Sequence, residues 1–206
     1  EPGAHIGLVS DIDDTVISTH LPRPLIAAWN TFVLTEQARD VVPGMADAYR
    51  AVLAEHPGAP VFYLSTGAWN TQPFLHRFLQ RHQFPAGALL TDWGPTNTGW
   101  FRSGREHKSR HLERLAEEFP DVRWVLVGDD GQHDPGIYDE FAESHRQHVA
   151  AIAIRQLTVI EQTLSRGLPV ALAELVRKHS GTVPVVTGGD GFALMPALLR
   201  ALGRRG

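Results

Sequence analysis

Three carboxylates occur within four positions where an apolar run ends, in the stretch HIGLVSDIDDTVIS at residues 5–18: Asp11, Asp13 and Asp14. Like charges a few ångströms apart repel by about one to several kcal/mol at the effective dielectric of a protein surface. Such a cluster therefore normally has raised pKa values or binds a cation. Asp11 and Asp13 are two residues apart, so an extended backbone places both side chains on one face. The pattern predicts a metal site in which one carboxylate attacks and the other transfers a proton; an acidic loop or helix start is the alternative.

Further polar residues follow later apolar runs. The stretch STG at residues 65–67 follows one run, and GDDGQHDP at residues 128–135 follows another. Taken alone, STG is also typical of a polar turn, and Asp134 before Pro135 is typical of a helix N-cap with proline in the first turn. Lys108 is one of only two lysines among 19 basic residues, which makes lysine the unusual cation here. By itself it also fits a solvated charge at the start of a helix.

The chain contains one clean His-x-x-x-His pair, His107 and His111, in the stretch REHKSRHLERL. Residues four apart on a helix lie on the same face, which is a spacing that zinc ligands use. We interpret the pair as a surface feature of an early helical turn rather than as a zinc site.

Short apolar runs alternate with helical periodicity along the chain. The helical pattern i, i+3, i+4, i+7 occurs after Pro43, a residue suited to a first helical turn, at Met45, Ala48, Tyr49, Val52 and Leu53. It occurs again at Leu112, Leu115, Ala116 and Phe119. Continuous apolar runs are typical of strands covered on both faces; they lie at residues 5–10, 61–65, 88–91, 124–127 and 149–154. This alternation predicts an α/β fold, a three-layer arrangement of a parallel sheet with helices on both faces. The polar residues that follow the strands would then meet at the carboxyl edge of the sheet, where such folds bind ligands.

Composition limits the classes of function. With 206 residues, 43% of them hydrophobic, the chain can form one well-buried domain. A formal net charge of −4 provides no basic field for nucleic acid, so a phosphate-bearing partner must bind at a local site. The absence of cysteine excludes disulfides and a thiol nucleophile. The sequence has no run of eighteen apolar residues, so it predicts no transmembrane segment. We expect a protein that is cytoplasmic or peripheral to a membrane. The sequence does not identify its protein partners.

The order of the polar motifs resembles that of the haloacid dehalogenase superfamily of phosphotransferases: Asp11-Ile12-Asp13-Asp14-Thr15, then Ser65, then Lys108, then Gly128-Asp129 with Asp134. The stretches SDIDDT, YLSTGAWN, HK and VGDDGQHDPGIY are more specifically similar to the catalytic domain of the actin-patch-type phosphatidate phosphatases and their bacterial relatives. The similarity runs from about Gly7 to Arg155. The chain departs from the pattern at Asp130, where the family resemblance leads us to expect serine.

The resemblance implies a set of catalytic roles. Asp11 would be the nucleophile that forms an aspartyl-phosphate, and Asp13 would protonate the leaving group and later activate water. Lys108 would offset the repulsion between the Asp11 carboxylate and an anionic substrate. The residues that would bind the substrate are Ser65, Thr66, Gly67, Trp69, Asn70 and Lys108.

The resemblance also implies a Mg²⁺ cofactor, because the available ligands are hard oxygens. The ligands would be the carboxylates of Asp11 and Asp129 and the backbone carbonyl of Asp13, with Asp134 as inner-sphere or outer-sphere support. An acidic residue at position 130 makes Mn²⁺ support plausible as well.

Residues 16–42, between the first motif and the first predicted helix, correspond to the position of the flap or cap in the superfamily. This insertion carries apolar residues at helical spacing, Leu25, Trp29, Phe32 and Val33. The stripe either packs onto the domain or, together with Trp69, faces outward beside the site and meets acyl chains. We expect a phosphatase domain at residues 1–155 and an extension at residues 156–206 that packs on it, with no motif we can assign.

The function that we expect is Mg²⁺-dependent hydrolysis of a phosphate monoester, with phosphatidate at a lipid surface as the substrate. Two alternatives stay open at this point. One is a phosphatase for a soluble metabolite, since no motif contacts the alcohol side of the ester. The other is a catalytically weak phosphate-binding or interaction module.

Overall fold

Continuous apolar runs form the central strands because both faces of the sheet are covered by helices. The structure is a computed structural model that describes residues 6–18, 40–92, 100–131, 133–158, 161 and 182–203. In chain order its elements are β1 (Ile6–Asp11), β2 (Ile17–Ser18), β3 (Asp40–Val41), α2 (Met45–Glu55), β4 (Val61–Ala68), the 3₁₀ turn η3 (Trp69–Thr71), α3 (Gln72–Arg81), β5 (Ala88–Asp92), α4 (Trp100–Glu118), β6 (Arg123–Asp129), α5 (Asp134–Ser144), the 3₁₀ turn η4 (Arg146–His148), β7 (Val149–Arg155), β8 (Val185–Gly188) and α8 (Gly191–Gly203).

The main sheet has six strands in the order β5-β4-β1-β6-β7-β8, and every pairing in it is parallel. All five predicted strands are present, which confirms the α/β fold. From β1 the chain proceeds outward through β4 and β5, then returns to β6 on the other side of β1 and proceeds outward through β7 and β8. Strand order therefore reverses beside β1, and α/β sheets bind ligands at the carboxyl ends of the strands at such a point.

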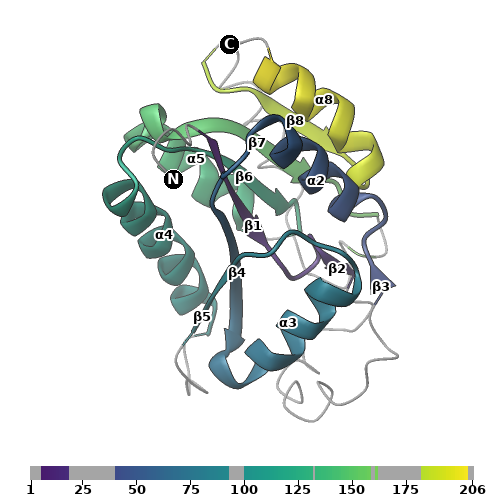
Figure 1. Ribbon diagram of the computed structural model, residues 1–206. Helices are drawn as coiled ribbons and strands as arrows, with labels where there is room; N and C mark the ends of the chain where they lie inside the picture. Colours follow the sequence, from purple (N-terminus) through teal and green to yellow (C-terminus); the bar gives the residue numbers. More distant parts are fainter. Residues whose placement is uncertain are drawn as a thin grey trace.

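Helices cover both faces of the sheet (Figure 1), and each face carries its own apolar core. Side chains alternate along β1, so that Leu8 packs on the face covered by α2, α3 and α8 and Val9 packs on the face covered by α4 and α5. The same alternation separates Val125 from Trp124 in β6. The result is the predicted three-layer arrangement, Rossmann-like in its layers and strand direction.

Both predicted helices are present. Met45, Ala48, Tyr49 and Val52 are buried in α2, and Leu112, Leu115 and Ala116 are buried in α4. Pro43, which the sequence placed in the first turn of the helix, instead lies in the preceding turn, because Gly44 is the N-cap with a left-handed φ of 71°. The backbone N–H of Gly191 donates to the Pro43 carbonyl at 2.9 Å, and a side chain at position 191 would overlap the Gly44 backbone. This close approach joins the start of α8 to the start of α2.

Residues beyond 155 include a sixth strand that the sequence did not place in the sheet. β8 pairs in parallel with β7, with Val185 opposite Ile152 and Gly188 opposite Arg155. It is the edge strand, it has four residues, and its first three residues are only half-buried. An edge strand of this kind lacks the long apolar run that marks a central strand.

The two described ends of the insertion, which we call its base, form a two-stranded antiparallel pair, β2 with β3 (Figure 1). Ile17 pairs with Val41 and Ser18 pairs with Asp40. The predicted stripe of Leu25, Trp29, Phe32 and Val33 lies outside the described residues. Among the helices that the structure does describe, none is long and apolar enough to cross a membrane.

Candidate active site

The carboxyl ends of three adjacent strands bring the predicted motifs together. β1 ends at Asp11 and β6 ends at Asp129, and these strands pair directly. On the other side of β1, Asp11 is opposite Leu64 of β4, so that Ser65 is the next residue along. The two motifs that are 118 positions apart in sequence, at Asp11 and Asp129, therefore lie at one edge of the sheet.

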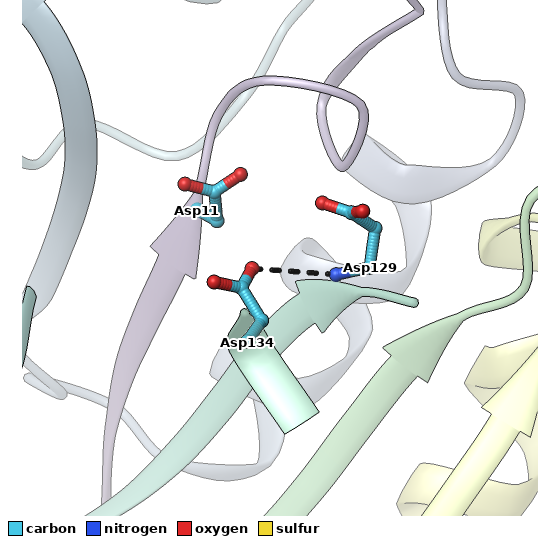
Figure 2. Close-up of side chains that lie close together, drawn as sticks. All are labelled: Asp11, Asp129 and Asp134. Atoms are coloured by element: carbon cyan, nitrogen blue, oxygen red, sulfur yellow. Dashed lines mark hydrogen bonds between the residues drawn. The ribbon is translucent and has the colours of Figure 1, made fainter. Parts of the chain in front are cut away.

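Three aspartates form a buried acidic triad at this edge: Asp11, Asp129 and Asp134 (Figure 2). One carboxylate oxygen from each lies within 4.8 Å of the others. Asp134 reaches the triad from the first position of α5, and its Oδ2 accepts the backbone N–H of Asp129 at 3.4 Å. A Cβ at position 128 would lie 2.4 Å from Asp134 Oδ2, so glycine at this position makes room for the third carboxylate.

Lys108 lies against two members of the acidic triad. Its Nζ is 2.6 Å from Asp11 Oδ1 and 2.6 Å from Asp134 Oδ1, and its side chain is only 12% exposed. Burial lowers the pKa of Lys108, but the two ion pairs outweigh burial and raise the pKa above its usual value. The lysine is therefore a fixed cation inside the site, and the alternative of a solvated helical charge is wrong.

The acidic triad carries more negative charge than one lysine balances. Burial is the largest cause that raises the pKa of Asp11; Lys108 opposes the shift, and the neighbouring carboxylates reinforce it, namely those of Asp134, Asp13 and Asp129. Burial also raises the pKa of Asp129, and Asp134 is the neighbour with the largest further effect. A cation bound among these groups would reverse the penalty, and carboxylate oxygens alone suit a hard divalent ion such as Mg²⁺. The side chains present thus fit the expected metal.

A tight turn follows Asp11 and returns the chain toward the triad. Asp14 has a left-handed φ of 60°, its N–H donates to the Ile17 carbonyl at 2.8 Å, and the Ile17 N–H donates to the Ile12 carbonyl at 3.0 Å. The Thr15 hydroxyl, on this turn, lies 3.3 Å from Asp129 Oδ2 and 3.5 Å from Asp11 Oδ2. The threonine of the DIDDT motif thus links the two strands that meet at the site.

Asp13 lies outside the acidic triad and faces β4. The Ser65 hydroxyl donates to Asp13 Oδ2 at 3.5 Å, which brings the predicted acid–base residue next to the predicted phosphate-binding serine. Thr66 and Gly67 continue β4 beyond this contact, and η3 presents Trp69 and Asn70 to solvent. Trp69 is 60% exposed.

Two interpretations from the sequence are wrong in this region. Asp134 does not cap α5: the N-cap is His133 without a side-chain cap bond, and the Asp134 carboxylate instead contacts Lys108 and the Asp129 backbone. His107 is not a surface residue: it is buried, and its ring packs edge-on against His111 with centroids 4.4 Å apart. Both errors arise because local helix signals do not show which residues of a neighbouring element lie opposite.

Asp130, where the sequence departs from the expected serine, turns away from the acidic triad. Its Oδ1 accepts the Leu157 N–H at 2.8 Å, and its own N–H donates to the Arg155 carbonyl at 3.0 Å. The Asp130 carboxylate therefore fixes the backbone just after β7, at Leu157.

Sequence reasoning missed a buried ion pair beside the site. Arg155, the last residue of β7, lies with its Nη2 2.7 Å from Glu161 Oε1, and both side chains are at most 8% exposed. Glu161 Oε2 also accepts the N–H and the hydroxyl of Thr158, both at 2.8 Å. This is the capping box Ser/Thr-x-x-Glu, and the sequence TVIE at residues 158–161 was the signal that could have found it.

The ion pair makes a definite prediction about acid stability. Burial alone would raise the pKa of Glu161, but the hydrogen bonds from Arg155 and Thr158 outweigh it and hold the pKa at about 2. A carboxyl with a lowered pKa contributes stability that is complete above its unfolded pKa, here about 4.5, and is lost as the pH falls toward 2. Glu161→Gln should cost about 3 kcal/mol in urea unfolding at pH 6 and progressively less between pH 4.5 and 2.

The control for this measurement is Glu118→Gln, which removes the exposed i,i+4 pair with Arg114 and should change unfolding by less than about 0.5 kcal/mol at any pH. A stability difference between wild type and Glu161→Gln that stays constant from pH 6 to pH 2 would contradict the prediction.

Comparison with known proteins agrees with the site. The family model for the catalytic domain of phosphatidate phosphatase APP1 matches residues 6–156, which span β1 to the end of β7 and include every residue of the acidic triad. A curated relative, phosphatidate phosphatase APP1 of Saccharomyces cerevisiae, is 27% identical over 154 residues, which is 73% of this chain and 26% of the relative. An uncharacterized protein of Schizosaccharomyces pombe is 25% identical over 154 residues, 74% of this chain and 25% of the relative.

The chain thus spans about a quarter of the length of these curated relatives, and the matched quarter holds the site. Because the family model covers well over half of the chain, from β1 to the end of β7, this chain belongs to the family of APP1-type phosphatidate phosphatase catalytic domains.

Proposed function

We propose that this domain is a divalent-metal-dependent phosphomonoester hydrolase of the haloacid dehalogenase type, with Asp11 as nucleophile and phosphatidate as substrate. The observation that carries the proposal is the position of Asp11. It ends β1, it is buried at 2% exposure, and it lies between Lys108 and two further carboxylates. A buried carboxylate paired with a fixed lysine at the switch point of an α/β sheet, with room for a cation to offset the remaining repulsion, suits nucleophilic attack on phosphorus.

The reaction would proceed in two displacements. In the first, an Asp11 carboxylate oxygen bonds to phosphorus as the bond from phosphorus to the leaving oxygen breaks, and the Asp13 carboxyl gives its proton to that oxygen. In the second, Asp13 takes a proton from water as the water oxygen attacks phosphorus, which releases inorganic phosphate and restores the Asp11 carboxylate. The contact between Asp13 and Ser65 supports these roles, since Ser65 is the side chain that would hold the phosphate.

A metal ion, when bound, would neutralise charge on the transferring phosphoryl oxygens. The residues that would hold it are Asp11, Asp129 and Asp134, with the backbone carbonyl of Asp13. Lys108 lies between Asp11 and Asp134 and would reduce the repulsion between their carboxylates. Its positive charge would also attract the anionic substrate. The backbone of Thr66 and Gly67 would complete the phosphate-binding end of the site.

Two observations favour phosphatidate over a soluble metabolite as the substrate: the family to which the chain belongs, and the exposed tryptophan that follows β4. Trp69 follows the phosphate-binding strand directly and exposes 60% of its surface. The amphipathic ring of tryptophan suits the lipid–water interface, where one end of the side chain is apolar and the other is hydrated. We propose that the domain works at a lipid surface during turnover.

Trp69→Ala should reduce hydrolysis of phosphatidate in mixed micelles by about tenfold or more while changing hydrolysis of a small soluble aryl phosphate by less than about twofold. The physical reason is that the ring contributes to contact with the lipid surface and not to the chemistry. The measurement is release of inorganic phosphate from each substrate in Mg²⁺.

Phe192→Ala is the matched control, because Phe192 is 56% exposed and lies at the opposite margin of the sheet, after β8. It should leave both activities within about twofold of wild type. Equal losses on both substrates in Trp69→Ala would show that Trp69 serves the fold or the chemistry. Brisk turnover of soluble monoesters by wild type with none of phosphatidate would favour the metabolite alternative, and no turnover of any monoester would favour the binding-module alternative.

A further inference from the structure

Arg155 lies opposite Asp129 in the neighbouring strand and connects three segments of the chain. Its Nη1 donates to the Asp14 carbonyl at 2.6 Å, its Nε donates to the Gly189 carbonyl at 3.2 Å, and its Nη2 donates to Glu161 Oε1 at 2.7 Å. The side chain is buried, so each of these contacts is shielded from water. The planar guanidinium thus joins the turn after the nucleophile, the end of β8 and the capping-box glutamate.

Glu161 extends the same network to the base of the insertion. Its Oε1, which accepts from Arg155, also accepts the Ser18 hydroxyl at 3.1 Å. Ser18 is in β2, the described N-terminal end of the insertion, and pairs with Asp40 of β3. One carboxylate oxygen therefore ties β2 to the arginine that contacts the Asp14 turn.

The Asp14 turn needs an external restraint. A non-glycine residue with a left-handed φ is strained and persists only where its surroundings over-determine the conformation. The turn lies between Asp13 and Thr15, so any relaxation of it would move the proposed acid–base carboxyl and the threonine that bridges Asp11 and Asp129. A charged donor on the Asp14 carbonyl supplies the restraint at the strained residue itself.

We propose that Arg155 and Glu161 are positioning residues that hold the Asp14 turn, and with it Asp13, in the geometry needed for proton transfer, and that they join this turn to the base of the insertion. Neither side chain touches the substrate side of the site. The kinetic part of the proposal rests on the proposed phosphatase function; the structural part does not.

The structural part is tested by hydrogen exchange of the intact chain without substrate. The amides of Asp14, Val16 and Ile17 all donate within the turn, and in Arg155→Met they should lose at least about tenfold of their protection. Amides in α3, which packs beside β5 at the opposite edge of the sheet from β8, should keep theirs. Arg114→Met is the matched control, since it makes the same chemical change at an exposed ion pair.

The kinetic part is tested with a soluble aryl phosphate in Mg²⁺. Arg155→Met should lower kcat by about ten- to a hundredfold with KM within about twofold of wild type, because the substrate-binding groups stay in place while the proton-transfer group is displaced. Arg155→Lys keeps the charge but loses the planar fork, and should recover part of kcat and part of the protection. Glu161→Gln changes the same ion pair from its other partner and gives the same comparisons if Arg155→Met does not fold.

Unchanged protection of the three turn amides in both Arg155→Met and Glu161→Gln would overturn the proposal, and so would a loosened turn with unchanged kcat. A wild-type chain that hydrolyses no monoester would instead overturn the proposed function, while the exchange data would still decide whether Arg155 restrains the turn.

Discussion

Asp11→Asn is expected to remove at least about 99% of turnover with any phosphate monoester, which corresponds to at least about 2.7 kcal/mol of lost transition-state stabilisation. The substitution is isosteric, but an amide cannot serve as the nucleophile. The fold should be retained, because Lys108 keeps its 2.6 Å contact with Asp134. Initial-rate measurements and the midpoint of thermal unfolding check the two parts.

The melting result distinguishes this loss from misfolding. Burial and the surrounding carboxylates raise the pKa of Asp11, so that its charge is unfavourable in the folded, metal-free protein. Removing the charge should leave the metal-free melting temperature equal to or higher than that of wild type. Asp121→Asn, at an exposed position before β6, is the control and should retain full activity. Retention of more than about a hundredth of the wild-type rate in Asp11→Asn would end the assignment of the nucleophile.

Removal of the metal is expected to abolish turnover completely, and Mg²⁺ should restore it. Ca²⁺ should bind but support little turnover, because its larger and looser coordination shell would misplace nucleophile and phosphorus. A second readout is independent of activity: Mg²⁺ should raise the melting temperature, since a ligand that binds only the folded state stabilises it. Here the ion would neutralise three buried carboxylates whose mutual repulsion the protein alone does not balance.

Asp129→Asn and Asp130→Asn form a matched pair for this test. Asp129 is a member of the acidic triad, whereas Asp130 accepts the Leu157 N–H, which an asparagine oxygen can also do. The Mg²⁺-dependent rise in melting temperature should fall sharply in Asp129→Asn and persist in Asp130→Asn. Full activity in the presence of a chelator, or equal Mg²⁺ responses in the two variants, would contradict the metal assignment.

The parts of the fold that were predictable are those with a strong one-dimensional signal. β1, β4, β5, β6 and β7 are continuous apolar runs because they are covered on both faces, and α2 and α4 have clear helical periodicity. The carboxyl ends of parallel strands lie at one edge of a sheet, and for this reason the spacing of the motifs alone predicts that Asp11 and Asp129 lie together.

The parts that were not predictable depend on contacts between distant segments. β8 is a short edge strand that is identified only by its pairing with β7. The Asp-Pro at residues 134–135 is a good local signal for an N-cap, but the carboxylate is drawn to Lys108 across the gap between α4 and α5. Arg155 ends an apolar strand, and nothing in its neighbours indicates that it donates to Asp14, 141 positions earlier.

We propose that Asp11 accepts the phosphoryl group of phosphatidate, and an acid quench during steady-state hydrolysis tests this most directly. The substrate is phosphatidate labelled on phosphorus, in mixed micelles with Mg²⁺. The account predicts that label is trapped covalently on the peptide that contains residues 6–18, that the bond has the lability of an acyl phosphate, and that neither Asp11→Asn nor the chelated enzyme acquires label. Release of labelled inorganic phosphate at the wild-type rate with no label on this peptide, or label that persists in Asp11→Asn, would contradict it.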